Sequence, residues 1–298
     1  MKSLSIITIN YNNAEGLRRT LASVAEQTYR NIEHIIVDGG SNDGSVDVIK
    51  EYVQRVNSEE RIVNSGRTIV WTSEPDKGIY NAMNKGIRKA TGDYIQILNS
   101  GDTLAAPDVT ERMVVALQQM YDVSMYDVFQ SSPVPILYGN MIKKDYATGK
   151  VISKSKDVEY SLRQYYCSSM NHDCCYIHRD VYEKFGLYDE NLKIVSDWKW
   201  FLQVIGLGDV KPVYVDIDVT VFDASGISER NLDLRIKERR QVLEEILPPA
   251  VLADYDKHAF DAEQMNRLRK YHLYGLVYFI ERVIFKLEKW RILQRVKA

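Results

Sequence analysis

The sequence predicts a doubly wound α/β fold of Rossmann-like type, with a mostly parallel mixed sheet and a helical C-terminal extension. Short apolar runs rich in β-branched residues alternate with segments of helical periodicity over the first 110 residues. Glycine-rich or polar turns follow directly after several of these runs. After Gly226 the sequence becomes charged and helical in pattern up to its end.

The first half of the chain supplies the parallel part of the predicted sheet. Apolar runs predict strands at residues 4–9, 33–37, 69–73 and 94–98. Helical spacing predicts helices around residues 17–24, 46–53 and 80–90. Because crossovers between parallel strands are right-handed, the loops after these strands should share one edge of the sheet, where open α/β sheets bind ligands.

The second half is less regular in pattern. Strands are expected at residues 136–142 and 150–155, joined as a hairpin through Ala147, Thr148 and Gly149. Further strands are expected at residues 174–178 and 213–222, with a short helix up to Phe185 and another beginning near Asp197. Pro248 and Pro249 should break the C-terminal helices once. We expect a catalytic domain at residues 1–225 and a helical, basic extension at residues 226–298.

The composition is that of a soluble globular protein. The chain has 298 residues, a net charge of −2, 45% hydrophobic and 27% charged residues, and is long enough to bury a large core. We find neither a signal-peptide pattern at the start nor a run of 18 apolar residues, so no membrane span is expected. The sparse cysteines Cys167, Cys174 and Cys175 fit neither a disulfide framework nor a zinc site. These features predict a cytoplasmic location.

The charge is concentrated at the C-terminus. Residues 267–298 hold nine Lys or Arg and two Glu, interspersed with an apolar stripe at helical spacing. An interfacial helix on an anionic membrane, at the inner face of the cell membrane, would have this pattern. A helix packed on the catalytic domain or on the partner of a homodimer would have it too. Nucleic-acid binding is disfavoured, because the aromatic residues belong to the apolar stripe and no known fold motif is present.

A glycine-rich turn follows the second predicted strand. Asp38 precedes Gly39, Gly40 and Ser41, and glycines let the backbone approach a ligand closely. The turn is neither a dinucleotide fingerprint, because Ser41 stands where glycine is needed, nor a phosphate loop, because no Lys-Ser/Thr pair follows Gly44. We expect it to bind a base or ribose, with Asp38 accepting a hydrogen bond from a base N–H. The alternative is that Asp38 and Ser41 only cap the next helix.

Two later segments carry candidate carboxylates. Asn99, Ser100, Gly101 and Asp102 follow the fourth predicted strand, where Asp102 could hold Mg²⁺ or Mn²⁺ together with substrate phosphates; a plain turn is the alternative. Asp197 begins a predicted helix, where it could accept the proton of an attacking hydroxyl or only cap the helix. Trp198 and Trp200 fit a core better than a sugar platform.

A histidine lies between two predicted elements in the polar segment Met170-Asn171-His172-Asp173. We weigh a contact of His172 with phosphate or acceptor equally against a structural role. The other four histidines form no constellation.

The order of these segments is more specific than any one of them. In chain order they are SIITINYN (5–12), SVAEQTY (23–29), IVDGGSNDGS (36–45), EPDKGIYNAMNKG (74–86), ATGDY (90–94), LNSGD (98–102) and SDW (196–198). This ordered set resembles the family 2 glycosyltransferases with the A-type nucleotide-sugar fold, including bacterial surface-polysaccharide members. The resemblance covers roughly residues 3–230.

The resemblance implies roles for individual residues. Asp197 would be the general base and Asp102 the ligand of the metal bridging the diphosphate. His172 and Trp198 would contact the diphosphate or the acceptor. The other implied residues bind the nucleotide-sugar donor. Those at the base would be Asn10, Tyr11, Asp38, Gly39 and Ser41, with Thr8 in the segment that shapes the base pocket. Asp76 and Asn84 would lie near the ribose, diphosphate or donor sugar, and Ser100 and Gly101 would also contact the donor.

One departure from the family pattern concerns the metal. Many relatives carry an acidic pair where this chain has Gly101-Asp102, and an acid where it has Asn99. Only one carboxylate remains at the motif, so we expect Mn²⁺ or Mg²⁺ to bind more weakly and to depend more on the donor phosphates.

The resemblance implies an inverting transfer of a sugar from a nucleotide-diphosphate donor, by default a UDP-sugar, to a saccharide or lipid-linked saccharide in cell-surface polysaccharide or glycolipid synthesis. Two other functions stay open. A sugar-phosphate nucleotidyltransferase would need a glycine-rich, Arg-containing loop where this chain has Asn10, Tyr11, Asn12 and Asn13. A non-catalytic nucleotide-sugar-binding protein could dispense with Asp197.

Overall fold

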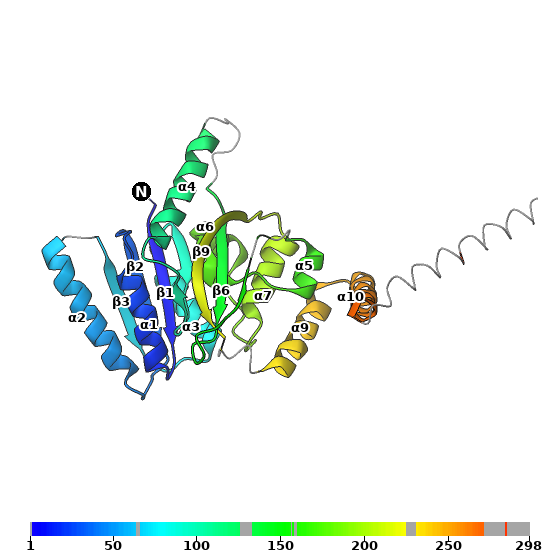
Figure 1. Cartoon of the computed structure of the whole chain (residues 1–298), viewed down its shortest axis with the longest axis horizontal. Helices are drawn as coiled ribbons and strands as arrows, with labels where there is room; N and C mark the ends of the chain where they lie inside the picture. Colours follow the sequence, from blue (N-terminus) through cyan, green and yellow to red (C-terminus); the bar gives the residue numbers. More distant parts are fainter. Residues whose placement is uncertain are drawn as a thin grey trace, which may run out of the picture. The chain divides into compact units, whose positions relative to one another are not determined.

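A computed structural model describes residues 2–63, 66–125, 133–155, 157, 160–224, 231–270 and 284 of the chain. The chain forms two compact units, Met1–Gln241 and Val242–Ala298. The first unit contains the sheet (Figure 1), and its residue range includes every predicted site residue. The predicted division into domains at residues 1–225 and 226–298 stays a prediction.

The first unit is built around one mixed sheet. Within the described residues its strands are β1 (Leu4–Asn10), β2 (Ile32–Asp38), β3 (Thr68–Ser73), β4 (Tyr94–Ile97), β5 (Thr103–Leu104), β6 (Ile136–Lys144), β7 (Val151–Lys154), β8 (Cys175–His178) and β9 (Val213–Asp223). They are ordered β3-β2-β1-β4-β8-β6-β9-β5, and β7 pairs with β6. The pairs β3–β2, β2–β1, β1–β4 and β6–β9 are parallel, whereas β8 is antiparallel to both its neighbours. This sheet confirms the predicted fold class.

The described helices follow the strands in the predicted alternation. They are α1 (Ala14–Ala25), α2 (Ser45–Val63), α3 (Ile79–Lys89), α4 (Val109–Met125), α5 (Leu162–Cys167), the 3₁₀ helix η1 (His172–Cys174), α6 (Arg179–Phe185), α7 (Ser196–Phe201), the π-helix η2 (Leu202–Gly206), α9 (Leu232–Ile246) and α10 (Pro249–Lys270). The predicted break at the two prolines is confirmed, since α9 ends at Ile246 and α10 begins at Pro249.

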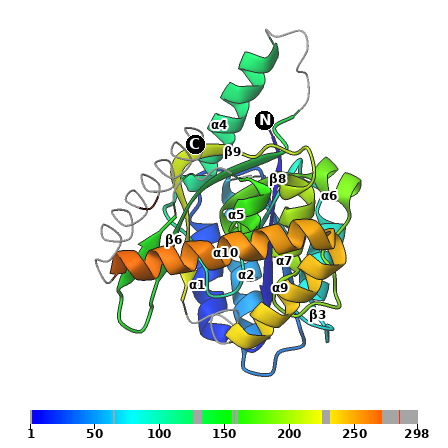
Figure 2. The ribbon, with the colours of Figure 1, turned by 90° about the vertical axis from the view of Figure 1, so that its right-hand side faces the viewer.

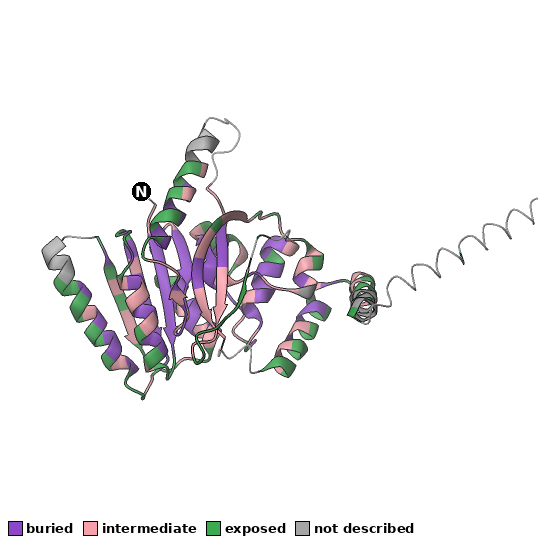
Figure 3. Cartoon of the chain, viewed as in Figure 1, coloured by how far each residue is buried: buried purple, intermediate pink, exposed green. Residues whose placement is uncertain are grey.

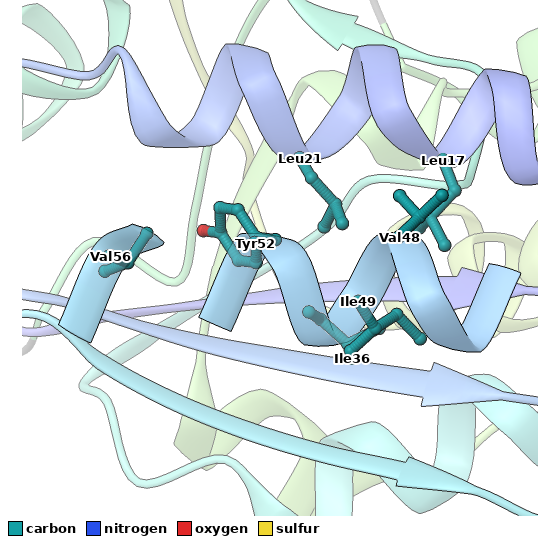
Figure 4. Close-up of a cluster of buried hydrophobic side chains, with 7 residues drawn as sticks. All are labelled: Leu17, Leu21, Ile36, Val48, Ile49, Tyr52 and Val56. Atoms are coloured by element: carbon teal, nitrogen blue, oxygen red, sulfur yellow. The ribbon is translucent and has the colours of Figure 1, made fainter. Parts of the chain in front are cut away.

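Helices cover both faces of the parallel strands. Ile36 of β2 packs with Leu17 and Leu21 of α1 and with Val48 and Ile49 of α2, in a cluster that Tyr52 and Val56 complete (Figure 4). Neighbouring residues of a strand point to opposite faces. Ile35 and its register partner Ile7 therefore face α3, where a Cβ on Gly86 would lie 2.3 Å from Ile7 Cγ2. Figure 3 shows the central strands buried between these layers.

The parallel register places polar residues at one edge of the sheet. Asn10 at the end of β1 pairs with Asp38 at the end of β2, and Asp38 pairs with Ser73 at the end of β3. On the other side of β4, β6 and β9 run side by side and parallel (Figure 2). The strand ends therefore bring together segments that are distant in the sequence.

The structure differs from the predicted elements in the middle of the chain. The hairpin of β6 and β7 is confirmed. We did not predict α4, α5, the two-residue β5 or the π-helix. None of the described helices has the length and apolarity needed to cross a membrane. The basic segment at residues 267–298, on which the predictions of membrane contact and of a homodimer rest, lies almost wholly outside the described residues.

Candidate active site

The carboxylate of Asp38 organises the glycine-rich turn after β2. Its Oδ1 accepts hydrogen bonds from Asn10 Nδ2 (2.8 Å) and Ser41 Oγ (2.6 Å), and its Oδ2 accepts from Ser41 N (2.9 Å) and Ser73 Oγ (2.6 Å). Burial alone would raise the pKa of Asp38, but these hydrogen bonds from Ser41, Ser73 and Asn10 lower it. Asp38 is fully buried, and because it bonds to Asn10 at the end of β1 and to Ser73 at the end of β3, it holds three strand ends together.

The rim of this turn presents groups suited to a nucleotide. Tyr11 is 67% exposed. A Cβ on Gly39 would lie 2.7 Å from Asp76 Oδ2 and 3.1 Å from Tyr11 Cδ2, so these three residues adjoin and a side chain at residue 39 would displace the carboxylate of Asp76. Asn10 Oδ1 is buried and accepts no hydrogen bond from the described residues. The exposed ring of Tyr11 is suited to stacking with a base, and the carboxylate of Asp76 beside Gly39 can accept a hydrogen bond from a ligand.

The segment after β4, residues 98–102, is bonded to helix α1 and to Asn13 just before it. Gly101 has a φ of +111°, a conformation that a residue with a side chain adopts only with strain. Its N–H donates to Thr20 Oγ1 (3.0 Å), and the same hydroxyl donates to the carbonyl oxygen of Asp102 (2.6 Å). Asn13 Nδ2 donates to the carbonyl oxygen of Ser100 (3.1 Å). The fourth strand end is thereby fixed beside the beginning of α1.

Two carboxylates that are distant from Asp102 in the sequence, those of Asp173 and Asp223, lie near it in the fold. Asp102 Oδ1 accepts a hydrogen bond from the backbone N–H of Asp223, at the end of β9 (2.8 Å). Burial raises the pKa of Asp102 well above its ordinary value, and the negative charge of Asp173 raises it further. Asp173 accepts from Thr220 Oγ1 (2.7 Å), and Asp223 pairs with Arg19 (3.1 Å).

The acidic surroundings of Asp102 fit a hard divalent cation. Carboxylate oxygens are the ligands that Mg²⁺ and Mn²⁺ prefer, and a cation there would offset the repulsion between Asp102 and Asp173. Among the described residues, however, no three or more His, Cys, Asp or Glu are grouped so that they could hold a metal by themselves. A metal at Asp102 would therefore need ligands from the substrate.

Asp197 is bonded through both carboxylate oxygens. Tyr80 of α3 donates its hydroxyl to Oδ1 (2.8 Å), and His172 Nδ1 lies 3.1 Å from Oδ2. The other ring nitrogen of His172, Nε2, lies 3.1 Å from Asn99 Nδ2. A chain of contacts thus runs from Asn99 after β4, through η1, to the first turn of α7 and across to α3.

The charges in this chain of contacts are defined by their neighbours. Burial would raise the pKa of Asp197, but the hydrogen bond and positive charge of His172, with the Tyr80 hydroxyl, lower it. Burial would lower the pKa of His172, but its contact with Asp197 raises it. Burial and Asp197 raise the pKa of Tyr80 well above its ordinary value. Asp197 is therefore a carboxylate at neutral pH, and Tyr80 keeps its proton.

A protonated His172 donates from both nitrogens and needs an acceptor at Nε2. Asn99 Oδ1 is buried and has no hydrogen-bond partner among the described residues. Turning the Asn99 amide by 180° would bring this oxygen to His172 Nε2, so that Asn99 accepts where an acid stands in the family pattern.

A cavity of about 180 Å³ opens beside Asp197. Its walls come from the end of β6, the segment between α5 and η1, the beginning of η1, the loop before α7 with the first turn of that helix, the end of β9, and helix α9. The lining residues are Met141, Lys143, Ser169, Met170, Asn171, His172, Asp173, Ile194, Val195, Asp197, Trp198, Phe222, Arg235 and Arg239. Asp197 and His172 are therefore accessible to a substrate from this side.

Three predicted site residues are bonded within the protein. Thr8 is fully buried and bonds through Oγ1 to His34 Nε2 (3.0 Å). Asn84 donates to the carbonyl oxygen of Tyr188 (2.8 Å) and to Glu190 Oε1 (2.9 Å), and accepts from Tyr188 N (3.0 Å). Trp198 donates its indole N–H to the carbonyl oxygen of Tyr165 (2.8 Å). The buried side chains of Thr8 and Asn84 stabilise the elements around the site through these bonds. Trp198 is part of the wall of the cavity.

Several residues around the site were not predicted. They are Tyr80, Asp173, Asp223, Lys143, Arg235 and Arg239. Asp173 and Tyr80 stand within segments that we had singled out, next to His172 and within residues 74–86, so proximity to a candidate was the available signal. Asp223, Lys143, Arg235 and Arg239 lie on strand ends and a helix that only the fold brings close.

Comparison with known proteins identifies relatives of the chain. The sequence model of the family described as "Glycosyl transferase family 2" matches residues 5–186. An uncharacterized glycosyltransferase of Mycobacterium tuberculosis is 31% identical over 228 residues, which are 76% of each chain. A PGL/p-HBAD biosynthesis glycosyltransferase of Mycobacterium bovis is 23% identical over 236 residues, covering 79% of this chain and 82% of the relative.

Solved structures share the fold. A mannosyltransferase of Pyrobaculum calidifontis in complex with GDP-Man and Mn²⁺ has a TM-score of 0.57 at 17% identity, over 82% of this chain. The chain spans less than two thirds of that structure's length, 64%. Residues 1–349 of S. aureus TarS in complex with UDP give a TM-score of 0.60 at 16% identity, over 89% of this chain and 74% of that one.

Proposed function

The chain belongs to glycosyl transferase family 2 and is a glycosyltransferase, and we propose that it inverts the anomeric centre as it moves a sugar from a UDP-sugar to an acceptor hydroxyl. The acceptor is a saccharide or lipid-linked saccharide of cell-surface polysaccharide or glycolipid synthesis. The Mycobacterium bovis relative named for PGL/p-HBAD biosynthesis supports this acceptor class.

The state of Asp197 is the observation that carries the proposal. It is a half-buried carboxylate with a lowered pKa at the wall of a cavity, held by His172 and Tyr80. Each carboxylate oxygen can accept a second hydrogen bond, so Asp197 can still receive the acceptor hydroxyl. His172 is less suited to be the base, because its raised pKa favours the protonated form.

The nucleotide-sugar donor binds at the ends of β1, β2 and β3, away from the cavity beside Asp197. The exposed ring of Tyr11 and the backbone of Gly39 would contact the base, and Asp76, which adjoins both, would lie toward the ribose. The neighbours that contain UDP or GDP-Man support a nucleotide-sugar donor. Asp38 serves this pocket through the positions of Asn10 and Ser41, because each of its oxygens already accepts two hydrogen bonds.

A divalent cation completes the donor side. Asp102 would hold it together with the donor phosphates, and Mn²⁺ in the mannosyltransferase neighbour supports this role. When bound, such a cation neutralises negative charge on the departing nucleotide diphosphate. Gly101 and Ser100 keep the backbone close to that place.

Transfer takes a single displacement. Asp197 removes the proton of the acceptor hydroxyl as its oxygen bonds to the anomeric carbon, while the bond from that carbon to the diphosphate oxygen breaks. Attack occurs on the face opposite the departing group, so the anomeric configuration inverts. His172, in contact with Oδ2 through its Nδ1, keeps the carboxylate oriented during the transfer.

Binding and product stereochemistry test the proposal together. A thermal-shift screen of UDP-, GDP- and dTDP-sugars, with and without Mn²⁺, should find a UDP-sugar that stabilises the chain by about 2.7 kcal/mol at 100 times its dissociation constant. The anomeric configuration of the product is then read by NMR. Retention of configuration, or stabilisation by GDP- or dTDP-sugars alone, would contradict the corresponding part of the proposal.

A further inference from the structure

We propose that the cavity beside Asp197 is a subsite for a phosphate or diphosphate group carried by the acceptor, bound by Arg235, Arg239 and Lys143. This inference rests on the proposed function, because it takes Asp197 to be the group that meets the acceptor. The three cations come from two separate places in the chain, the end of β6 and helix α9, and line the same cavity.

Arg235 is the cation most available to a ligand. It is half-buried on α9 and reaches the cavity. Within the part of the chain that the structure describes, its guanidinium makes neither an ion pair nor a side-chain hydrogen bond, whereas Arg18, Arg19 and Arg88 all pair with carboxylates. A guanidinium withdrawn from solvent without a counter-ion favours binding of an anion.

Arg239 stands one helical turn further along α9 and is held in place. Its guanidinium lies over the ring of Trp198, 4.8 Å from the centroid, and Nη2 lies 3.5 Å from the carbonyl oxygen of Ser168. Because residues four apart on a helix share a face, Arg235 and Arg239 point to the same side. Two guanidinium groups on one face match the several oxygens of a phosphate.

The acidic residues in the walls are already engaged. Asp173 accepts a hydrogen bond from Thr220 Oγ1, and Asp197 is bonded to His172 and Tyr80. Neither lies within ion-pair distance of Arg235. The remaining walls are largely apolar, formed by Met141, Met170, Ile194, Val195 and Phe222. Apolar walls strengthen the attraction between the cations and an anion, since they lower the local dielectric.

The cavity lies on the side of Asp197, and among its lining residues Asp173 is the one whose charge acts on Asp102 most strongly. The lining contains Asp197, which takes the acceptor proton, and none of Asn10, Tyr11, Asp38 or Asp102 from the donor side. At about 180 Å³ the cavity is smaller than the roughly 300–1,000 Å³ of common ligand pockets. It therefore fits one charged group of an acceptor, and the rest of that molecule would extend beyond it.

Calorimetric titration of inorganic pyrophosphate into the full chain tests the subsite, with and without saturating UDP. Pyrophosphate should bind the UDP-saturated wild type, and Arg235→Gln should weaken that binding about tenfold. Lys237→Gln is the matched control, because Lys237 is exposed on the same helix, loses the same charge and is not part of the lining. It should bind pyrophosphate like the wild type.

Three results would overturn the inference. Equal weakening by Arg235→Gln and Lys237→Gln would indicate only a general charge effect, and unchanged binding by Arg235→Gln would remove the arginine from the site. Loss of pyrophosphate binding once UDP is added would assign the anion to the donor diphosphate. If the proposed function is wrong, the result differs, because no nucleotide binds. The titrations without UDP then still measure how much Arg235→Gln weakens pyrophosphate binding.

Discussion

At the residue scale, Asp197 and His172 form the most informative contact of the molecule. Each changes the pKa of the other in the direction that favours its charged form, and each does so against the effect of burial. Two charged groups in a site withdrawn from water are costly unless they are paired and hydrogen-bonded. Tyr80 and Asn99 supply the additional partners, so the pair can persist beside a cavity.

Replacing His172 should change the pH dependence of transfer. In the wild type, the lowered pKa keeps Asp197 ionised down to pH values below its ordinary 3.8. Without the cation of His172, burial dominates and raises the pKa of Asp197. His172→Gln should therefore move the acid limb of kcat/KM to higher pH, whereas His178→Gln, the matched control at a histidine beside Asp180, should not.

The same pair makes stability depend on pH with a defined sign. The raised pKa of His172 contributes stability that is present below its ordinary 6.5 and is lost as pH rises through the folded value. The lowered pKa of Asp197 contributes stability that is present above 3.8 and is lost as pH falls through the folded value. The loss of thermal stability in His172→Gln should thus be largest between pH 3.8 and 6.5; a loss independent of pH would contradict the charge pairing.

At the scale of elements, the regular half of the fold could be predicted and the irregular half could not. Apolar periodicity in the sequence predicts strands β1 to β4 and helices α1 to α3. The parallel register of β1, β2 and β3 then places Asn10, Asp38 and Ser73 side by side. By contrast, β5 has two residues and exists because Thr103 and Leu104 pair with β9. Such pairing is tertiary and leaves no local pattern.

The site follows the same division. The sequence indicated Asp38, Asp102, His172 and Asp197 singly, since each lies at the end or start of an element. It could not indicate that Asp173 and Asp223 surround Asp102, or that α9 turns Arg235 and Arg239 toward Asp197, because those proximities depend on the order of strands and helices.

Helix α3 offers a test of an element-level role for Asn84. Its amide joins α3 to the backbone of Tyr188 and to Glu190. Asn84→Ala should lower the free energy of unfolding by roughly 1–3 kcal/mol, because the buried groups of Tyr188 lose their partner, while the KM for donor changes little. Asn191→Ala, in an exposed local turn of the same segment, is the control. A large rise in donor KM without loss of stability would instead place Asn84 in direct contact with donor.

At the scale of the whole molecule, the proposed function divides the site into a donor side and an acceptor side. The ends of β1, β2 and β3, with Tyr11, Gly39 and Asp76, would form the donor side. The ends of β6 and β9, with α7 and α9, form the cavity that contains Asp197. Asn99 after β4 connects the two, since it follows the central strand and reaches His172.

The most direct test of the central claim is single-turnover transfer by Asp197→Asn, measured with donor binding on the same preparation. A positioned base typically contributes roughly 10²–10⁴-fold to the rate. We predict a loss of transfer in that range with a donor dissociation constant close to that of the wild type. Near-wild-type transfer with intact donor binding would contradict the assignment of Asp197 as the base.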